Sequence, residues 1–276
     1  MRLRFTKMHG LGNDFVMLDA VSQKLNVTEA LIRKLANRNF GIGCDQVLVV
    51  ETPRKPNVDF RYRIFNADGS EVENCGNGAR CFAVFARQRG LTSKTSIAVE
   101  TCGGDMILTV HEDNSVTVNM GVPNFEPASI PFTAEAREPQ YSLELNKQTL
   151  DISALSVGNP HAVHFVDDLA SFPVTEIGPQ VEIHSRFPQK VNAGFIQIVS
   201  RNEARVRVFE RGVGETIACG TGACAAIAAG RQLGLLDETV AVHLGGGTLT
   251  ISWAGGSSDL MMTGPTATVF HGQINI

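Results

Sequence analysis

The stretch NCGNGARCFA, residues 74–83, sets a cysteine directly before small residues that lead into an apolar run. The stretch ACGTGACAAI, residues 218–227, sets another cysteine in the same way. The two share the pattern Glu-x-x-x-Cys-Gly-x-Gly-Ala, and their cysteines, Cys75 and Cys219, are 219 − 75 = 144 residues apart. A pattern that recurs after half the chain length predicts an internal duplication.

Other segments recur at nearly the same separation. Asn13 and Asn159 both follow a glycine, and they are 159 − 13 = 146 residues apart. Each cysteine pattern also follows a segment in which apolar and polar residues alternate, residues 58–65 and 204–210, which is typical of a half-buried strand. We therefore expect an α+β chain made of two copies of one unit.

The remaining elements are expected from shorter signals. Residues 28–41 have helical spacing, a possible cap at Thr28 and a glycine at the end. Short β-prone segments bounded by Gly, Asn and Asp lie at 96–101, 105–111, 115–120, 239–244 and 248–253. Prolines crowd residues 123–139, so we place a crossover there and a domain boundary near residue 120.

Composition excludes several classes of protein. With 276 residues, 43% of them hydrophobic, the chain can bury a substantial core, and its net charge of −4 gives no basic field for nucleic acid. No apolar stretch is long enough for a membrane span or a signal peptide, which predicts a cytoplasmic protein. Six cysteines without a secretory signal are expected to be reduced thiols.

Each motif cysteine precedes an apolar run that ends at a glycine, so we expect both at or just before a helix N-terminus. Free amide groups and the helix dipole favour an anion there, which would lower a thiol's pKa towards neutrality and seat a carboxylate. If the duplication brings the two helix starts together, one thiol lies on each side of an amino acid's α-carbon. A two-base epimerisation requires this geometry and needs no cofactor.

With these residues the sequence resembles the diaminopimelate epimerase family, PLP-independent epimerases of lysine and peptidoglycan precursor synthesis. The likeness covers nearly the whole chain. It is carried, in order, by MHGLGNDF (8–15), FNADGSEVENCGNGARC (65–81), GNPHAV (158–163), VNAGF (191–195) and ERGVGETIACGTGACA (210–225).

The resemblance implies two pseudo-symmetric lobes, each a mostly antiparallel, barrel-like sheet wrapped round a central helix. Residues 1–119 would form the first lobe, joined by a returning C-terminal strand at 265–276. Residues 120–264 would form the second, with the catalytic cleft between them. A homodimer is also implied, although Phe270 stands where the family often has tyrosine near the dimer contact.

The resemblance further implies the role of each site residue. The acid/base pair matches Cys75 and Cys219. The positions that would hold the substrate's carboxylate match Gly76, Asn77, Gly220 and Thr221. The other substrate-binding positions match Asn13, Gln46, Asn66, Asn159, Asn192, Glu210 and Arg211. His161 and Glu210 would tune the thiols. The ligand would be diaminopimelate, with no cofactor, metal, nucleic acid or membrane as partner.

Other interpretations stay open beside this one. Proline and hydroxyproline racemases use the same two-thiol logic, and a two-lobed amino-acid-binding protein would need no thiols. Phenazine-biosynthesis-like isomerases have a carboxylate acid/base in place of the cysteine pair, so the two cysteines exclude them. Cysteine spacing matches structural zinc poorly, and the Gly-x-Gly stretches lack the rest of a dinucleotide motif. The two catalytic thiols could also join in an inactivating disulfide. The remaining cysteines are expected to be small core residues: Cys44, Cys81, Cys102 and Cys224.

Overall fold

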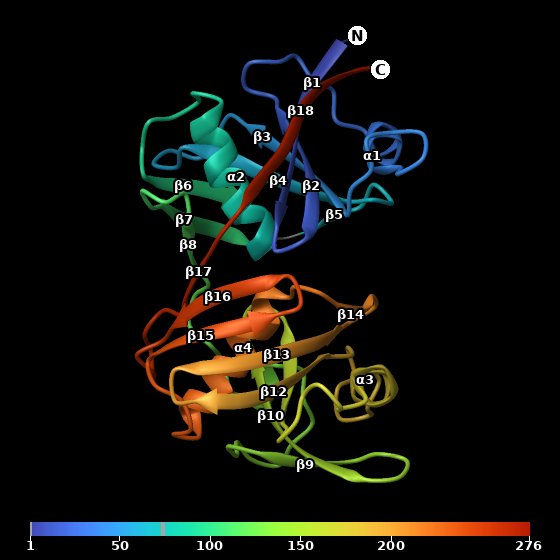
Figure 1. Ribbon diagram of the computed structural model, residues 1–276, viewed down its shortest axis with the longest axis vertical. Coiled ribbons are helices and arrows are strands. Elements are labelled where there is room, and N and C mark those ends of the chain that lie inside the picture. Colours follow the sequence, from blue (N-terminus) through green and yellow to red (C-terminus); the bar gives the residue numbers. More distant parts are fainter. Residues whose placement is uncertain (1, 73–74) are drawn as a thin grey trace. The chain divides into compact units, whose positions relative to one another are not determined.

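The computed structural model describes residues 2–72 and 75–276, and the chain divides into two compact units. One unit is Met1–Asn119 with Thr263–Ile276, and the other is Met120–Met262. Strands outnumber helices in each unit, and each unit contains a helix enclosed by its sheet (Figure 1). The α+β fold class expected from the sequence is confirmed.

The first unit begins with a long antiparallel hairpin and ends with strands around its helix. Its elements are β1 (Arg2–Gly10), β2 (Asn13–Asp19), α1 (Glu29–Ala36), β3 (Gln46–Glu51), β4 (Phe60–Asn66), β5 (Glu71–Val72), α2 (Gly76–Gln88), β6 (Ser96–Thr101), β7 (Gly104–Val110) and β8 (Val116–Asn119). The C-terminal strand β18 (Ala267–Asn275) returns to this unit and pairs antiparallel with β1.

The second unit follows the same plan after an irregular entry that contains the 3-10 turn η1 (Pro127–Ser129). Its elements are β9 (Tyr141–Glu144), β10 (Thr149–Ser156), β11 (Pro160–Phe165), α3 (Val174–Glu182), β12 (Asn192–Ser200), β13 (Glu203–Glu210), β14 (Gly214–Thr216), α4 (Gly220–Gln232), β15 (Thr239–Leu244) and β16 (Gly247–Ser252). The chain leaves it along β17 (Met261–Gly264).

The strand pairings confirm the internal duplication. In the first unit, β1–β2, β3–β4, β4–β5 and β6–β7 pair antiparallel, whereas β2–β3 and β4–β6 pair parallel. The second unit repeats this order and sense from β10 to β16. Even the register is kept, because Phe15 lies opposite Gln46 and His161 lies opposite Asn192. Equivalent residues therefore occupy equivalent places in the two sheets.

The central helices α2 and α4 are buried on every side along most of their length. Their small residues permit this, because added bulk would collide with the surrounding sheet. A Cβ atom on Gly78 would lie 2.5 Å from the Tyr62 hydroxyl, and one on Gly222 would lie 2.6 Å from a Val208 methyl. Helices enclosed in this way present only their ends to a ligand.

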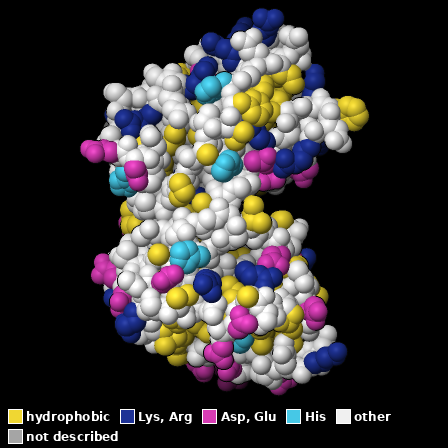
Figure 2. Space-filling view, in the orientation of Figure 1, with side chains coloured by type: hydrophobic (Ala, Val, Ile, Leu, Met, Phe, Trp, Pro, Cys, Tyr) yellow, Lys and Arg dark blue, Asp and Glu magenta, His cyan; other side chains and the backbone are white. Residues whose placement is uncertain are grey.

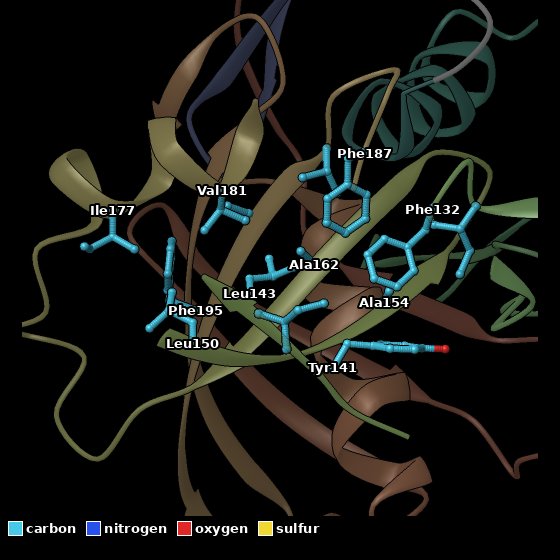
Figure 3. Packing of buried hydrophobic residues seen from close by; sticks show 14 of the residues in the cluster. Phe132, Tyr141, Leu143, Leu150, Ala154, Ala162, Ile177, Val181, Phe187 and Phe195 are labelled. Carbon is cyan, nitrogen blue, oxygen red and sulfur yellow. The ribbon is translucent and has the colours of Figure 1, made fainter. Parts of the chain in front are cut away.

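A second apolar layer covers the outer face of each sheet. In the first unit, α1 packs Ile32 and Leu35 against strand residues that include Leu3 and Val47. In the second unit, the layer is rich in aromatic rings, with Phe132 and Phe187 facing one another at 4.6 Å between centroids (Figure 3). Charged side chains of both signs are interspersed with apolar ones on the face shown in Figure 2.

Two local expectations were wrong. The helix expected over 28–41 begins after Thr28 as expected but ends at Ala36, because the Asn37 side chain accepts hydrogen bonds from the amides of Asn39 and Phe40 and the chain turns back. Cys102 is exposed in the turn between β6 and β7 and is not a core residue. Cys44, Cys81 and Cys224 are buried as expected.

The packing of the outer layer predicts that truncating a buried side chain of β12 destabilises the protein much more than truncating an exposed side chain of the same strand. Phe195 of β12 is 1% exposed and packs its ring 4.9 Å from that of Phe172. We expect Phe195→Ala to lower the free energy of unfolding by about 3–5 kcal/mol in urea titrations. Val199→Ala, 45% exposed on the same strand, serves as the control and should cost under about 1 kcal/mol. Equal losses would contradict the packing described.

Candidate functional site

Both motif cysteines are helix N-caps, as expected from the sequence. Cys75 precedes α2 with φ −150° and ψ 118°, and Cys219 precedes α4 with φ −101° and ψ 105°. Extended dihedrals at this position leave the first-turn amides facing the capping side chain. In the second unit the Gly222 amide donates to Cys219 Sγ at 3.4 Å. Each thiol therefore lies at the electropositive end of a buried helix.

In the first unit, the structure brings three of the expected residues together around this helix start. The Oδ1 atom of Asn13 lies 3.7 Å from Cys75 Sγ and 3.4 Å from the amide nitrogen of the Asn77 side chain. Gln46 and Asn66 lie opposite one another on β3 and β4, and their side chains are joined by a hydrogen bond of 3.0 Å. The partly exposed Cys75 thiol is thus bordered by neutral amides.

A layer of charged residues that sequence reasoning missed supports these amides. Asp45 accepts a hydrogen bond of 2.9 Å from Asn13 Nδ2, which directs Asn13 Oδ1 towards Cys75. Arg38 pairs with both Asp45 and Asp14. Burial alone would raise the pKa of Asp14, but hydrogen bonds from Arg38 and Lys7 hold that pKa well below its usual range. Asp14 therefore stays ionised and keeps the network intact.

Arg80 is a further residue that sequence reasoning missed. Its side chain is fully buried within α2 and donates to Asn77 Oδ1 at 2.8 Å and to the Gly76 carbonyl at 3.3 Å. It therefore fixes the orientation of the Asn77 amide beside Cys75. Arginine in a helix is usually solvent-exposed, so the sequence signal was only its position, one turn after the cysteine.

In the second unit, an equivalent group surrounds Cys219. The Thr221 hydroxyl lies 3.6 Å from Cys219 Sγ and accepts a hydrogen bond of 3.4 Å from Asn159 Nδ2. The Asn159 Oδ1 atom in turn lies 2.9 Å from His161 Nε2. His161 is fully buried, and burial, with the positive charge of Arg211 adding to it, lowers the pKa of its ring to about 3. His161 is therefore neutral and holds the Asn159 amide.

Asn192 and Arg211 are joined through the backbone. The buried Asn192 side chain accepts from the Arg211 amide at 2.9 Å and donates to the Pro160 carbonyl at 2.9 Å. The Arg211 guanidinium donates to the Gln189 carbonyl at 3.2 Å and is otherwise directed to solvent. Asn192 thus orients Arg211 and contributes mainly as its support.

Glu210 sets the electrostatics of the Cys219 thiol. It accepts a hydrogen bond from the Thr216 hydroxyl and contacts Cys219 itself. Burial raises the pKa of Glu210, and burial together with the Glu210 carboxylate raises the pKa of Cys219 well above its usual range. The expectation of a lowered pKa is therefore wrong for Cys219, because loss of hydration and a nearby negative charge outweigh the hydrogen bonds from Thr221 and Gly222.

The other thiols show no sign of a site. Burial raises the pKa of both Cys44 and Cys81 to about 12, as for small core residues. Among residues 2–72 and 75–276, no group of three or more His, Cys, Asp or Glu side chains is arranged to hold a metal ion.

Comparison with known proteins places these residues in a family context. A family model described as diaminopimelate epimerase matches residues 5–126 and 153–269. The diaminopimelate epimerase of Teredinibacter turnerae is 64% identical over all of both chains, and that of Thioalkalivibrio sulfidiphilus is 59% identical over the same full coverage.

Solved structures of lower identity share the fold. A hydroxyproline epimerase from Agrobacterium vitis has a TM-score of 0.70 at 17% identity, over 99% of this chain and 92% of that one. A phenazine biosynthesis protein of the PhzF family from Bacillus anthracis has a TM-score of 0.68 at 18% identity, over the whole of both chains.

The contact between Glu210 and Cys219 predicts how the thiol responds to pH. In Glu210→Gln the negative charge that raises the thiol's pKa is gone, so that pKa falls and alkylation accelerates at lower pH. We expect faster iodoacetamide labelling of Cys219 at every pH between about 7 and 9, followed by peptide mass analysis. Glu203→Gln, on the same strand but paired with His243, is the control and should leave the profile unchanged. If the pH profile of Cys219 labelling in Glu210→Gln is unchanged or moves to higher pH, Glu210 does not raise the pKa of this thiol.

Proposed function

The chain belongs to the diaminopimelate epimerase family, and on that premise we propose that it interconverts LL- and meso-2,6-diaminopimelate by two-thiol proton transfer at one α-carbon. The observation that carries the proposal is the repeated placement of a cysteine as N-cap of a buried central helix, once in each unit. A thiolate removes the α-proton from one face while a thiol delivers a proton to the other, which inverts the centre. The product serves lysine and peptidoglycan precursor synthesis.

The substrate's reacting carboxylate is assigned to the helix starts. Gly76 and Asn77 form the first turn of α2, and Gly220 and Thr221 form the first turn of α4. When the α-proton leaves, negative charge moves onto the carboxylate oxygens, and fixed amide donors stabilise that state more than the ground state. The Thr221 hydroxyl, held by Asn159, adds a further donor in the second unit.

The two thiols begin the reaction in different roles. The raised pKa of Cys219 keeps it protonated at neutral pH, so it starts as the proton donor. Cys75 caps the start of α2, whose electropositive end favours a thiolate, so it supplies the base in the same direction, and the roles exchange in reverse. Glu210 and the neutral His161 tune this arrangement, one through its charge and the other by holding Asn159.

The far end of the substrate carries a second ammonium and carboxylate. We assign the carboxylate to Arg211, whose planar guanidinium suits it, with Asn192 fixing its backbone. The side chains of Asn66, Asn159 and Glu210 supply oxygen acceptors for the ammonium, and Asn13 and Gln46 complete the group. Proline racemisation is the alternative activity, but a proline ring would leave these polar groups unpaired at a cost of about 1–3 kcal/mol.

We further propose a cytoplasmic homodimer. Val269 and Phe270 of β18 are 55% and 45% exposed although apolar, which favours a contact with a second copy. The Phe270 ring also packs edge to face on Phe5 at 5.8 Å between centroids, so Phe270 contributes by apolar contact without a hydroxyl. Cys44, Cys81, Cys102 and Cys219 are free thiols, which fits a reducing compartment. Among the described residues, no helix has the length and apolarity needed to cross a membrane.

The assignment of the two thiols predicts that removing either one greatly lowers the epimerisation rate. We expect Cys75→Ala and Cys219→Ala each to lower the epimerisation rate at least about 1,000-fold, because each removes one acid/base group. Cys224→Ala, a buried cysteine one turn into α4, controls for the loss of a thiol as such and should stay within about threefold. Rates are measured with LL-diaminopimelate in heavy water without added PLP or metal.

The same assay tests the reaction type. Meso product should carry solvent deuterium at the inverted α-carbon, because the returned proton comes from an exchangeable thiol. Product without deuterium, or full activity in either single mutant, is incompatible with the proposed mechanism.

A further inference from the structure

The glutamate of the repeated pattern has no place in the proposed chemistry, yet in both units it accepts two hydrogen bonds from one arginine. Glu71 additionally accepts a hydrogen bond from Cys102 Sγ at 3.5 Å. Arg63 donates to Glu71 through Nε at 2.8 Å and Nη2 at 2.6 Å. Arg207 donates to Glu215 through the same atoms at 2.7 Å and 3.0 Å. Two parallel bonds of this kind fix the carboxylate's orientation as well as its distance. The separations 207 − 63 and 215 − 71 both equal the 144 residues between the cysteines.

The ion pair of the second unit secures a very short strand. Glu215 lies in β14, three residues long, and Glu71 lies in β5, whose described residues are Glu71–Val72. A strand of three residues makes few backbone hydrogen bonds and holds its register weakly. In the sequence, each glutamate precedes a capping cysteine by four residues.

In the second unit, the pair lies on the opposite face of the hairpin from the thiol. Val208 lies opposite Thr216, and Phe209 lies opposite Glu215. Because side chains alternate along a strand, Thr216 shares the face of Val208 and Glu210, whereas Glu215 shares that of Arg207. On the first face Thr216 donates to Glu210, which contacts Cys219. Glu215 therefore acts on the thiol only through the strand that carries Thr216.

The arginines are themselves immobilised. Arg207 Nη1 donates to the carbonyls of Leu169 and Phe172 at 3.0 Å and 3.1 Å. Arg63 donates to Glu51 at 3.1 Å and lies over the Phe65 ring at 4.7 Å. The side chains are 19% and 27% exposed in the first pair and 32% and 25% in the second. Because each arginine is already held by other contacts, forming the ion pair costs little further side-chain entropy, whereas an isolated surface pair must immobilise both side chains.

We propose that Glu71 and Glu215 are positioning residues that, through Arg63 and Arg207, hold β5 and β14, the strands that precede Cys75 and Cys219 in the chain. The catalytic consequence rests on the proposed function, whereas the structural consequence for each thiol does not. Each glutamate serves the cysteine of its own unit. Loss of one ion pair thus affects one thiol and spares the other.

The test compares the two thiols within one molecule. In Glu215→Gln, we expect alkylation of Cys219 by iodoacetamide to accelerate at least about fivefold relative to Cys75, with kcat for epimerisation falling about tenfold at little-changed KM. For Glu215→Gln the exposed Cys102, in the other unit, is the internal reference. Glu71→Gln should instead change the rate for Cys75 and spare Cys219, which is the reference for this variant because Glu71 also accepts a hydrogen bond from Cys102 Sγ at 3.5 Å. Asp237→Asn, which removes an exposed pair with Arg201, is the matched control with no effect.

A double-mutant cycle separates the ion pair from general destabilisation. Arg207→Gln with Glu215→Gln should change the Cys219 rate no more than Arg207→Gln alone, because Arg207→Gln already removes the ion pair together with the bonds to the Leu169 and Phe172 carbonyls. Should Glu215→Gln not fold, Glu215→Asp, which keeps the charge but shortens its reach, is assayed for the same selective change. Additive effects, equal changes at both cysteines, no change at either, or unaltered kcat would each overturn the proposal. Selective labelling in a protein without epimerase activity would refute the proposed function and leave the positioning intact.

Discussion

The electropositive start of a buried helix is the constraint on which the placement of each motif cysteine depends. A helix enclosed by a sheet, as α2 and α4 are, can offer only its ends to a ligand, and its N-terminus favours an anion. Glycine and alanine allow the enclosure, since a Cβ on Gly78 or Gly222 would strike the strands. The same small residues that let the helix be buried therefore bring its amides to the place where a carboxylate can reach them.

Duplication then supplies two such starts with unequal surroundings. Asn66 and Glu210 occupy equivalent positions, 210 − 66 = 144 residues apart, at the ends of β4 and β13. One is a neutral amide and the other a buried carboxylate that contacts Cys219. The proposed two-base reaction needs one base and one acid at the outset, and in that proposal this difference at one position separates the two roles. The near-symmetry of the fold is broken at this position.

Much of this was predictable from the sequence, and the failures have physical causes. The strands at 96–101 and 239–244 were placed to the residue, since alternation and turn residues are local signals. The helix start after each cysteine followed from the apolar run. The early end of α1 was missed because an asparagine side chain competes with the helical hydrogen bonds.

The electrostatics of the site could not be predicted in the same way. The direction of the Cys219 pKa shift depends on burial and on Glu210, nine residues earlier in the chain, and the role of Arg80 depends on its complete burial. Hydrophobic pattern shows which residues leave water, but it does not show which charges they meet when they do so. Tertiary packing therefore decides whether the pKa of a buried thiol is raised or lowered.

The central claim is that Cys75 and Cys219 serve one carbon. Its most direct test is a crystal structure of the protein with an unreactive analogue of diaminopimelate bound. The account predicts both sulfur atoms within about 3.5 Å of the α-carbon, one on each face, with the adjoining carboxylate on the amides that begin α2 and α4. An α-carbon reached by one sulfur alone, or by both from the same face, would contradict it.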